Sequence, residues 1–459
     1  MTKSQQSTDE SAVHRDDSRP HVVVIGGGFG GLRAARDLAK APVRVTLIDR
    51  RNFHLFQPLL YQVATGGLSP AHIAAPLRNV FKRQRNLRVL LGEVTDVDPD
   101  AQRVLLEDGH VHYDYLVIAA GARFHYFGND EWVTRAPGLK SVEDALEIRR
   151  RVYGAFEAAE RTDDPDEIRR LLTFVIVGAG PTGVELAGAL TEIARHTLRH
   201  EFRAIDPSQT RVILLDAAPH VLDSYPRDLR DKAAESLREL GVDVRTGLMV
   251  TDVREDGVTV KAADGTERPI QAQSVLWAAG VRAAGIAEAL AARGAAECGK
   301  GGFLTTTRRL HLPKHPNVYV VGDLAAPPDD GGEAWPGVAP RAIQQGAYAA
   351  RAIAKTVAGE THDIEPFAYH DKGSMATIGR SKAVADLGRL HFSGFPAWLL
   401  WLAVHLFSLV LTRDRVFVAL QWAYNYATWN RGARLITDQP VMRPVAAEQA
   451  AADEQEHAA

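Results

Sequence analysis

The stretch HVVVIGGGFGGLRAARDLAKAPVRVTLID, from His21 to Asp49, decides the fold. Three glycines, Gly26, Gly28 and Gly31, follow a first apolar run at Gly-x-Gly-x-x-Gly spacing, and a helix-forming segment, a second apolar run and an acid complete the stretch. In a dinucleotide-binding βαβ unit such glycines allow a tight turn, the close approach of a pyrophosphate, and the packing of helix on strand. The acid stands where a carboxylate accepts hydrogen bonds from a ribose hydroxyl. The stretch therefore predicts a dinucleotide site.

A second copy of this pattern follows later in the chain. An apolar run precedes Gly178, Gly180 and Gly183, and another apolar run ends at Asp216. The acid lies farther from the glycines than the usual spacing of about 20 residues. An insertion at 195–209, expected to be a polar helical region, would account for this. Two copies predict two dinucleotide sites, and the carboxylate of Asp216 disfavours a 2′-phosphate by like charge, so NADH is expected in preference to NADPH.

The composition limits the proteins to which two such sites can belong. With 459 residues, 46% hydrophobic and 24% charged, the chain is long enough for two or three domains. The net charge of -3 and a pI of about 6.6 argue against nucleic-acid binding. A single cysteine, Cys298, excludes an internal disulfide, a cysteine-ligated iron–sulfur cluster and a dithiol redox pair, and no metal site is expected. Residues 1–20 are polar, which predicts a disordered tail rather than a signal peptide, with a reducing cytoplasmic interior as the default.

Three further strand ends carry small or acidic residues. One strand ends in Ala120 and Gly121, and another ends just before Gly280. Small residues there let the backbone approach a nucleotide, although a tight strand exit would require them too. A third strand delivers Asp323 to the carboxyl end of a sheet, where α/β proteins bind ligands. A helix N-cap is the plainer interpretation of this acid, and the two roles are compatible.

Two stretches allow more than one interpretation. Residues 51–62 show little periodicity. The sequence favours neither a loop that covers the sheet nor a segment that contacts a cofactor over the other. Glu185 follows the second glycine motif closely. A carboxylate in the first turn of a helix is commonly a favourable partner of the helix dipole. Because this turn should face the nicotinamide side of a nucleotide, a functional role is favoured.

The C-terminal region has the composition of a membrane-surface segment. Residues 395–412 are mostly apolar but marginal for spanning a bilayer, which needs about 20 such residues. The polar residues His405, Ser408 and Thr412 are expected on one face of a helix. Four of the seven tryptophans lie between 398 and 429, among arginines that suit the headgroup level. Helices lying in the membrane surface are therefore expected, and a dimer interface could bury the same stripe.

These features resemble those of two-dinucleotide-binding-domain flavoproteins, and among them those of type II NADH dehydrogenase, a single-subunit NADH:quinone oxidoreductase. The resemblance covers nearly everything between His21 and Ile436. The segments that carry it are FQPLLYQVATG (56–66), EDALEIRRRV (143–152), WAAGV (277–281), VYVVGDLA (318–325), AIQQG (342–346) and DKGSMATIGR (371–380).

The resemblance implies an α/β fold with two Rossmann-like dinucleotide-binding domains, one for FAD and one for NADH, plus a C-terminal membrane-surface helical segment. The FAD-binding domain is expected to be discontinuous, at 21–140 and 303–372, with the NADH-binding domain at 141–302. A membrane-associating or dimerisation region follows at 373–440. A disordered tail is expected at 441–459.

The resemblance also implies a role for each site residue. Gln344 and Gln345 would lie beside the quinone and Lys372 near the flavin ring, where they stabilise charge or relay protons. Glu185 would help to orient the nicotinamide. The expected FAD contacts are Gly26, Gly27, Gly28, Phe29, Gly30, Gly31, Asp49, Arg50, Val94, Ala120, Gly121, Asp323, Ala339 and Lys372, and the expected NADH contacts are Gly178, Gly180, Gly183, Glu185, Asp216, Gly280 and Val281.

Two positions depart from the family pattern. Ala120 replaces a threonine that is common before the glycine, which removes one hydroxyl contact. Arg341 places a charge beside the expected quinone end. Considered without the family, Gln344 and Gln345 would simply solvate a helix surface, and Lys372 would be an ordinary surface lysine.

The implied activity has two half-reactions. NADH passes a hydride to FAD, and two electrons then reach a respiratory membrane quinone, menaquinone or ubiquinone, without proton pumping. The resemblance places the enzyme on the cytoplasmic face of the cell membrane as a peripheral homodimer. Disulfide reductases and sulfide:quinone oxidoreductases need cysteines that this chain lacks. A soluble NAD(P)H-dependent reductase of a protein acceptor and a redox-responsive flavoprotein scaffold are the alternatives.

Overall fold

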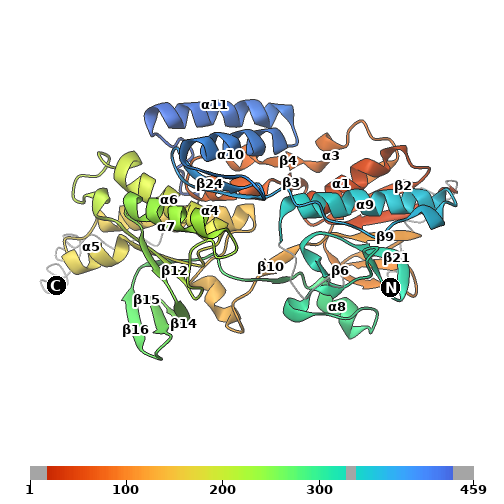
Figure 1. Cartoon of the computed structure of the whole chain (residues 1–459), viewed down its shortest axis with the longest axis horizontal. Coiled ribbons are helices and arrows are strands. Elements are labelled where there is room, and N and C mark those ends of the chain that lie inside the picture. Colours follow the sequence, from red (N-terminus) through yellow and green to blue (C-terminus); the bar gives the residue numbers. More distant parts are fainter. Residues whose placement is uncertain (1–17, 327–336, 438–459) are drawn as a thin grey trace, which may run out of the picture. The chain divides into compact units, whose positions relative to one another are not determined.

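The computed structural model describes residues 18–326 and 337–437. The chain divides into two compact units, and Figure 1 labels their elements. The first unit comprises the residues up to Asn52, Leu77–Gly121 and Ala283–His370, and the second comprises Phe53–Pro76, Ala122–Arg282 and the residues from Asp371 onward.

The borders of these units differ from the expected domain ranges. Residues 53–76 and 122–140 belong to the second unit, and residues 283–302 belong to the first. The last difference has a clear packing reason, because α8 (Ile286–Ala292) buries Ile286 and Leu290 in a core of the first unit. The tail expected at 441–459 and most of the one expected at 1–20 lie outside the described residues.

A six-stranded sheet forms the centre of the first unit. Its strand order is β20-β21-β9-β1-β2-β5, and the pairs are parallel except for β20 with β21. The strands are β1 (His21–Ile25), β2 (Arg44–Asp49), β5 (Leu87–Leu91), β9 (Tyr115–Ile118), β20 (His311–Leu312) and β21 (His315–Val320).

Strand β1 is buried on both faces, as expected of a central parallel strand. Val22 and Val24 join one core cluster, and Val23 and Ile25 join the other, because successive side chains point to opposite faces. Helices α1 (Phe29–Asp37) and α9 (Ala339–Val357) pack together over the first cluster, as Figure 1 shows. Further elements of this unit are α3 (Leu77–Val80), β6 (Val94–Asp98), β7 (Arg103–Leu106), β8 (Gly109–His112), β19 (Leu304–Thr305) and β22 (Ala325–Ala326).

A second parallel sheet, of four strands in the order β13-β12-β11-β17, forms the centre of the second unit. Its helices include α4, which starts at a capping box between Ser141 and Asp144. The elements are β11 (Thr173–Val177), β12 (Arg211–Asp216), β13 (Asp243–Thr246), β17 (Ser274–Trp277), α4 (Val142–Ala159), α5 (Pro165–Leu171), α6 (Pro181–Glu192), α7 (Arg227–Leu240), β14 (Leu248–Arg254), β15 (Gly257–Ala262), β16 (Glu267–Gln271), β10 (Ala122–Phe124) and β18 (Val281–Ala283).

The helix expected at 195–209 is wrong, and the structure disfavours one of the two alternatives for residues 51–62. Residues 195–209 do not form a regular helix: a π-helical turn at Ile193–Thr197 and a 3-10 turn at Pro207–Gln209 are their helical parts. The segment 51–62 is more ordered than a plain loop. It contains β3 (Phe53–Leu55), which pairs with β4 (Ala74–Pro76), a 3-10 turn and the start of α2 (Leu60–Ala64).

The C-terminal part of the second unit is a three-stranded sheet followed by two helices. The strands β23 (Ser374–Gly379), β24 (Lys382–Asp386) and β25 (His391–Ser393) are antiparallel. Figure 1 shows α10 (Gly394–Ser408) lying next to β24, with α11 (Thr412–Thr428) alongside α10. Helix α6 approaches β23 closely, since a Cβ atom on Gly188 would lie 1.6 Å from the carbonyl oxygen of Ile378.

The apolar run 395–412 is not one helix. The backbone turns extended at Leu409 (φ -60°, ψ 138°), so His405 and Ser408 lie on α10 while Thr412 begins α11. The polar side chains of α10 form hydrogen bonds within their own helix. Ser408 Oγ donates to the Val404 carbonyl oxygen, and His405 Nδ1 lies 2.7 Å from the Trp401 carbonyl oxygen. Of the helices that the structure describes, none combines the length and the apolar character needed to cross a bilayer.

Candidate functional site

The first glycine loop has the geometry that its sequence predicts. Gly26 has a φ of +94°, in the left-handed region that favours glycine. A Cβ atom on Gly31 would lie 1.8 Å from the Gly26 carbonyl oxygen, so the helix can pack against the turn only without a side chain there. Around Gly28, the N-cap of α1, the described residues leave open space within 4 Å of such an atom. A phosphate could approach the backbone N–H groups there.

The second glycine loop repeats these three features. Gly178 has a φ of +104°, and a Cβ atom on Gly183 would lie 1.8 Å from the Gly178 carbonyl oxygen. Gly180 caps α6 and, within the described part of the chain, has open space beside it as Gly28 does. The two loops are therefore equivalent parts of two Rossmann-like units, which confirms the expected fold class.

The two acids at the strand ends also hold equivalent positions. Asp49 accepts hydrogen bonds from the backbone N–H groups of Gly27 and Arg51, the second at 2.7 Å. Asp216 accepts from those of Ala179 and Ala218, the latter at 2.7 Å. Each carboxylate thus holds its glycine loop in shape. Because a carboxylate has about four acceptor positions, it can still receive a ribose hydroxyl.

The other residues expected around FAD come from several elements. Those in the first unit lie at strand ends or helix starts: Val94 begins β6, Gly121 follows β9 with a φ of +71°, Asp323 follows β21, and Ala339 begins α9. Arg50 pairs with Glu93 at 3.7 Å, with both side chains more than half exposed. Lys372 belongs to the second unit and is exposed.

The two adjacent glutamines on α9 differ in environment. Gln345 is fully buried, and its Oε1 accepts a hydrogen bond from the backbone N–H of Gly322 at 2.7 Å. Gln344 makes two bonds with His370: its Nε2 donates to the carbonyl oxygen at 2.9 Å, and its Oε1 accepts from the N–H at 3.0 Å. Arg341, also on α9, is buried, and burial lowers its pKa. The interpretation of both glutamines as mere surface solvation is therefore wrong, because their amides bind backbone groups.

Glu185 is a half-buried residue of the second unit. It is the fifth residue of α6, beyond the first turn, so the interpretation as a first-turn partner of the helix dipole does not hold. Burial raises the pKa of Glu185 to about 8, partly offset by the nearby Thr377 backbone and Trp401 side chain. The nearby Tyr61 hydroxyl is buried and its pKa is raised, first by burial and then by the charge of Glu185. Glu185 can therefore hold a proton at neutral pH.

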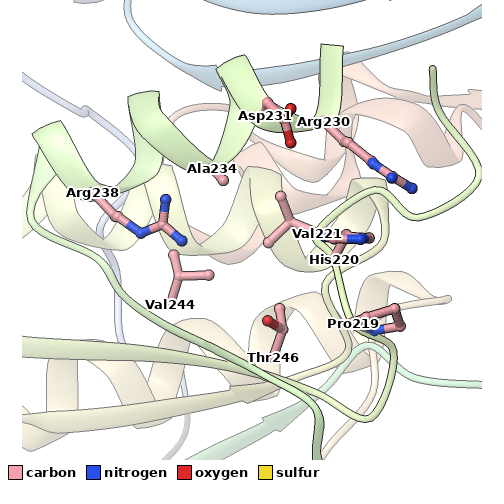
Figure 2. Close-up of a pocket in the computed structure, with 9 residues that line it drawn as sticks. All are labelled: Pro219, His220, Val221, Arg230, Asp231, Ala234, Arg238, Val244 and Thr246. Atoms are coloured by element: carbon pink, nitrogen blue, oxygen red, sulfur yellow. The ribbon is translucent and has the colours of Figure 1, made fainter. Parts of the chain in front are cut away.

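A cavity of about 240 Å³ lies beside the second strand-end acid. Thr246, which lines it, is the register partner of Asp216. Figure 2 shows the guanidinium groups of Arg230 and Arg238 on the α7 side of this cavity. Asp231 lines the cavity as well, so two arginine side chains and one carboxylate face it.

Comparison with known proteins identifies the family. Residues 20–346 match the pyridine nucleotide-disulphide oxidoreductase family, and residues 371–428 match the NDH2 C-terminal domain. The type II NADH:quinone oxidoreductase Ndh of Mycobacterium tuberculosis is 48% identical over 450 residues, covering 97% of this chain and 96% of the relative. The chain belongs to the type II NADH:quinone oxidoreductase family.

Two further similarities accompany this one. The NdhA type II NADH:quinone oxidoreductase of the same bacterium is 48% identical over 442 residues, covering 95% of this chain and 92% of the relative. The structure of NDH2 from Plasmodium falciparum in complex with NADH matches with a TM-score of 0.81 at 20% identity. It covers 91% of this chain and 100% of that one, which shows a shared fold.

Sequence reasoning missed the surroundings of Glu185 in this type II oxidoreductase. Tyr61, Thr377 and Trp401 come from three segments far apart in the chain. Tyr61 and Thr377 lie inside the motifs FQPLLYQVATG and DKGSMATIGR. Their place in these two family motifs is the one feature of the sequence that points to them. Trp401 is one of the four tryptophans between 398 and 429 that suggest a membrane-surface segment, yet it is only 1% exposed.

Proposed function

We propose that this chain is a type II NADH:quinone oxidoreductase, an FAD-dependent NADH dehydrogenase that reduces a membrane quinone without pumping protons. The observation that carries the proposal is the pair of equivalent glycine loops, each with its strand-end acid, in a chain that is 48% identical to a protein of that name over nearly its whole length.

The first unit fits the FAD. The left-handed Gly26, the open space at Gly28 and the carboxylate of Asp49 suit a pyrophosphate and its ribose. Residues from Gly26 to Gly31, with Asp49, Arg50 and Val94, would hold the adenosine and phosphates, and Ala120, Gly121, Asp323 and Ala339 the remainder. Lys372, which belongs to the second unit, would lie near the flavin ring. When bound, the flavin supplies the redox chemistry, accepting a hydride and delivering electrons.

The second unit fits NADH. Gly178, Gly180 and Gly183 would hold the pyrophosphate, and Asp216 would bind the adenosine ribose at the end of β12. Because β17 lies on the other side of β11 from β12, a nucleotide that crosses the glycine loop ends beside Gly280 and Val281. The nicotinamide would therefore lie on the β17 side.

Protons for the quinone need groups that can hold and release them. Glu185, whose pKa is raised to about 8 by burial, is protonated at neutral pH and would hold a proton on its carboxyl group while the nicotinamide is oriented beside it. The side chain of Lys372, exposed and cationic, would stabilise negative charge near the flavin. Gln344 and Gln345 would lie beside the quinone, although both amides already bind backbone groups.

Helices α10 and α11 would lie in the membrane surface. They expose large apolar side chains, with Phe407 70% and Leu420 64% exposed. An exposed face of this kind marks an interaction surface, and the internal hydrogen bonds of Ser408 and His405 leave few polar groups of α10 to water. The arginines of this region suit the headgroup level at the cytoplasmic side of the membrane, whereas Trp401 is buried. The alternative is that the same face forms the interface of a homodimer.

The decisive experiment follows NADH absorbance with the purified FAD-loaded protein in detergent, with and without a short-chain quinone, and with NADPH in place of NADH. Rapid oxidation that requires quinone and fails with NADPH is expected. Menaquinone and ubiquinone analogues then rank the acceptors. If the protein consumes one equivalent of NADH and then stops despite added quinone, the acceptor is not a quinone, and a soluble reductase of a protein acceptor or a redox-responsive scaffold becomes the better interpretation.

A further inference from the structure

The turn at Tyr126–Asn129 has an unusual residue in a demanding position. Phe127 and Gly128 both have positive φ, at +54° and +96°. The backbone N–H of Asn129 donates to the Tyr126 carbonyl oxygen at 3.0 Å, which closes the turn. Two central residues with positive φ are typical of a type I′ turn, where Asn-Gly is the favoured pair. Phenylalanine stands here in the position that suits asparagine.

Burial does not explain this placement. The side chain of Phe127 is 60% exposed, so the strained backbone gains little from removing the ring from water. The turn is nevertheless held firmly. Trp277 Nε1 donates to the His125 carbonyl oxygen at 3.1 Å, and Tyr126 Oη donates to that of Ala136 at 2.8 Å. A rigid turn that presents an exposed aromatic ring in a costly conformation indicates a use for the ring.

The ring of Phe127 lies beside Gly280. A Cβ atom on Gly280 would lie 2.8 Å from the tip of the phenyl ring, so the absence of a side chain there makes room for it. The phenyl ring also lies next to the imidazole of His125, with ring centroids 4.5 Å apart, and next to the indole of Trp277, at 6.4 Å. Val281, the next residue, exposes 44% of its surface. The end of β17 therefore carries a small exposed apolar surface formed by Phe127 and Val281.

The strand order indicates what meets this surface. In the order β13-β12-β11-β17, Asp216 ends β12 and Gly280 follows β17. With the adenosine ribose at Asp216 and the pyrophosphate at the β11 glycine loop, the other base of the nucleotide comes to the end of β17. We propose that Phe127 binds the nicotinamide end of NADH, its ring packing against the nicotinamide riboside as an aromatic wall. This inference rests on the proposed function.

The substitution Phe127→Asn separates this role from a structural one. Asparagine adopts positive φ readily and forms the favoured Asn-Gly turn, so the variant should melt at a higher temperature than the wild type, by a few degrees. Loss of an aromatic contact should weaken NAD⁺ binding, measured by calorimetry, about fivefold to tenfold and raise the KM for NADH similarly, with a smaller change in kcat. Phe127→Tyr keeps the ring and should restore both values.

Gln102→Asn is the matched control. Gln102 is another exposed residue with positive φ, at +50°, in the turn before β7. The control should share the gain in melting temperature and leave NAD⁺ affinity unchanged. Wild-type NAD⁺ affinity and KM in Phe127→Asn would overturn the inference. Calorimetry with NAD⁺ needs no acceptor, so a failure of quinone reduction by the wild type would count against the proposed function and leave this measurement intact.

Discussion

Arg431 and Glu192 form an ion pair whose Nη2 and Oε2 atoms lie 3.0 Å apart, with side chains only 13% and 12% exposed. Glu192 is the last residue of α6 and also accepts a hydrogen bond from the backbone N–H of Arg380. Arg431 lies beyond α11 and donates to Thr65 Oγ1 at 2.9 Å. The pair therefore joins the chain after the C-terminal helices to the helix that carries Glu185.

Removing one partner of this pair should destabilise the second unit. Arg431→Gln leaves the Glu192 carboxylate buried without its cation, which costs about 3 kcal/mol. The free energy of urea unfolding, followed by circular dichroism, should fall by that amount. Arg227→Gln is the control, because Arg227 and its partner Asp231 are 86% and 61% exposed and such pairs contribute little. Equal losses in the two variants would show that the buried pair is not special.

Glu185 predicts a pH dependence of stability. Burial raises its pKa from 4.5 to about 8, so between these values the folded protein binds a proton that the unfolded chain releases. Stability should therefore fall as the pH rises from about 4.5 to about 8 and level off above that. Glu185→Gln cannot ionise and should remove this contribution, roughly 5 kcal/mol at pH 9.

Because other groups titrate in the same range, the readout is the difference in unfolding free energy between wild type and Glu185→Gln across pH 5 to 9. A constant difference would show that the carboxyl group titrates normally. In turnover, a step that uses the Glu185 proton should show an apparent pKa near 8 in the wild type that is absent from the variant.

The parts of this protein that could be predicted from sequence are those fixed by neighbours along the chain. Gly26 and Gly31 meet across one turn, and Asp49 ends the next strand, so spacing alone places them. The environment of Glu185 depends on three distant segments, which local patterns do not report. The break at Leu409 has no glycine or proline to announce it, and the positive φ of Phe127 is indicated only by the glycine that follows.

Asp216 should set the preference for NADH over NADPH. Arg230 and Arg238 line the adjacent cavity, so a 2′-phosphate would find positive charge there if the carboxylate of Asp216 were neutralised. Asp216→Asn keeps an acceptor for the Ala179 N–H but removes the charge. The ratio of kcat/KM for NADH to that for NADPH should fall by about tenfold to a hundredfold.

Asp231→Asn provides the control for the nucleotide preference. Asp231 lines the same cavity from α7, away from the strand end. This variant should change the NADH to NADPH ratio much less than Asp216→Asn does. If the two substitutions act alike, the general charge of the cavity, rather than a contact of Asp216 with the ribose, determines the preference.

The exposed face of α10 and α11 should govern attachment to lipid. Replacing Phe407 and Leu420 together by glutamate puts charge where apolar area would enter the bilayer surface, and burial of each side chain is worth about 1.5 to 3 kcal/mol. The affinity for anionic vesicles, measured by cosedimentation, should fall at least tenfold. Turnover with a vesicle-borne quinone should fall with it, and turnover with a water-soluble quinone should stay near the wild-type value. Met249→Glu, at a residue 53% exposed on β14, should change neither. The contrary outcome is that the double variant keeps its vesicle binding and sediments as a monomer where the wild type sediments as a dimer. In that case the added charge has broken a contact between proteins and left the lipid contact intact. The face would then join two copies of the chain.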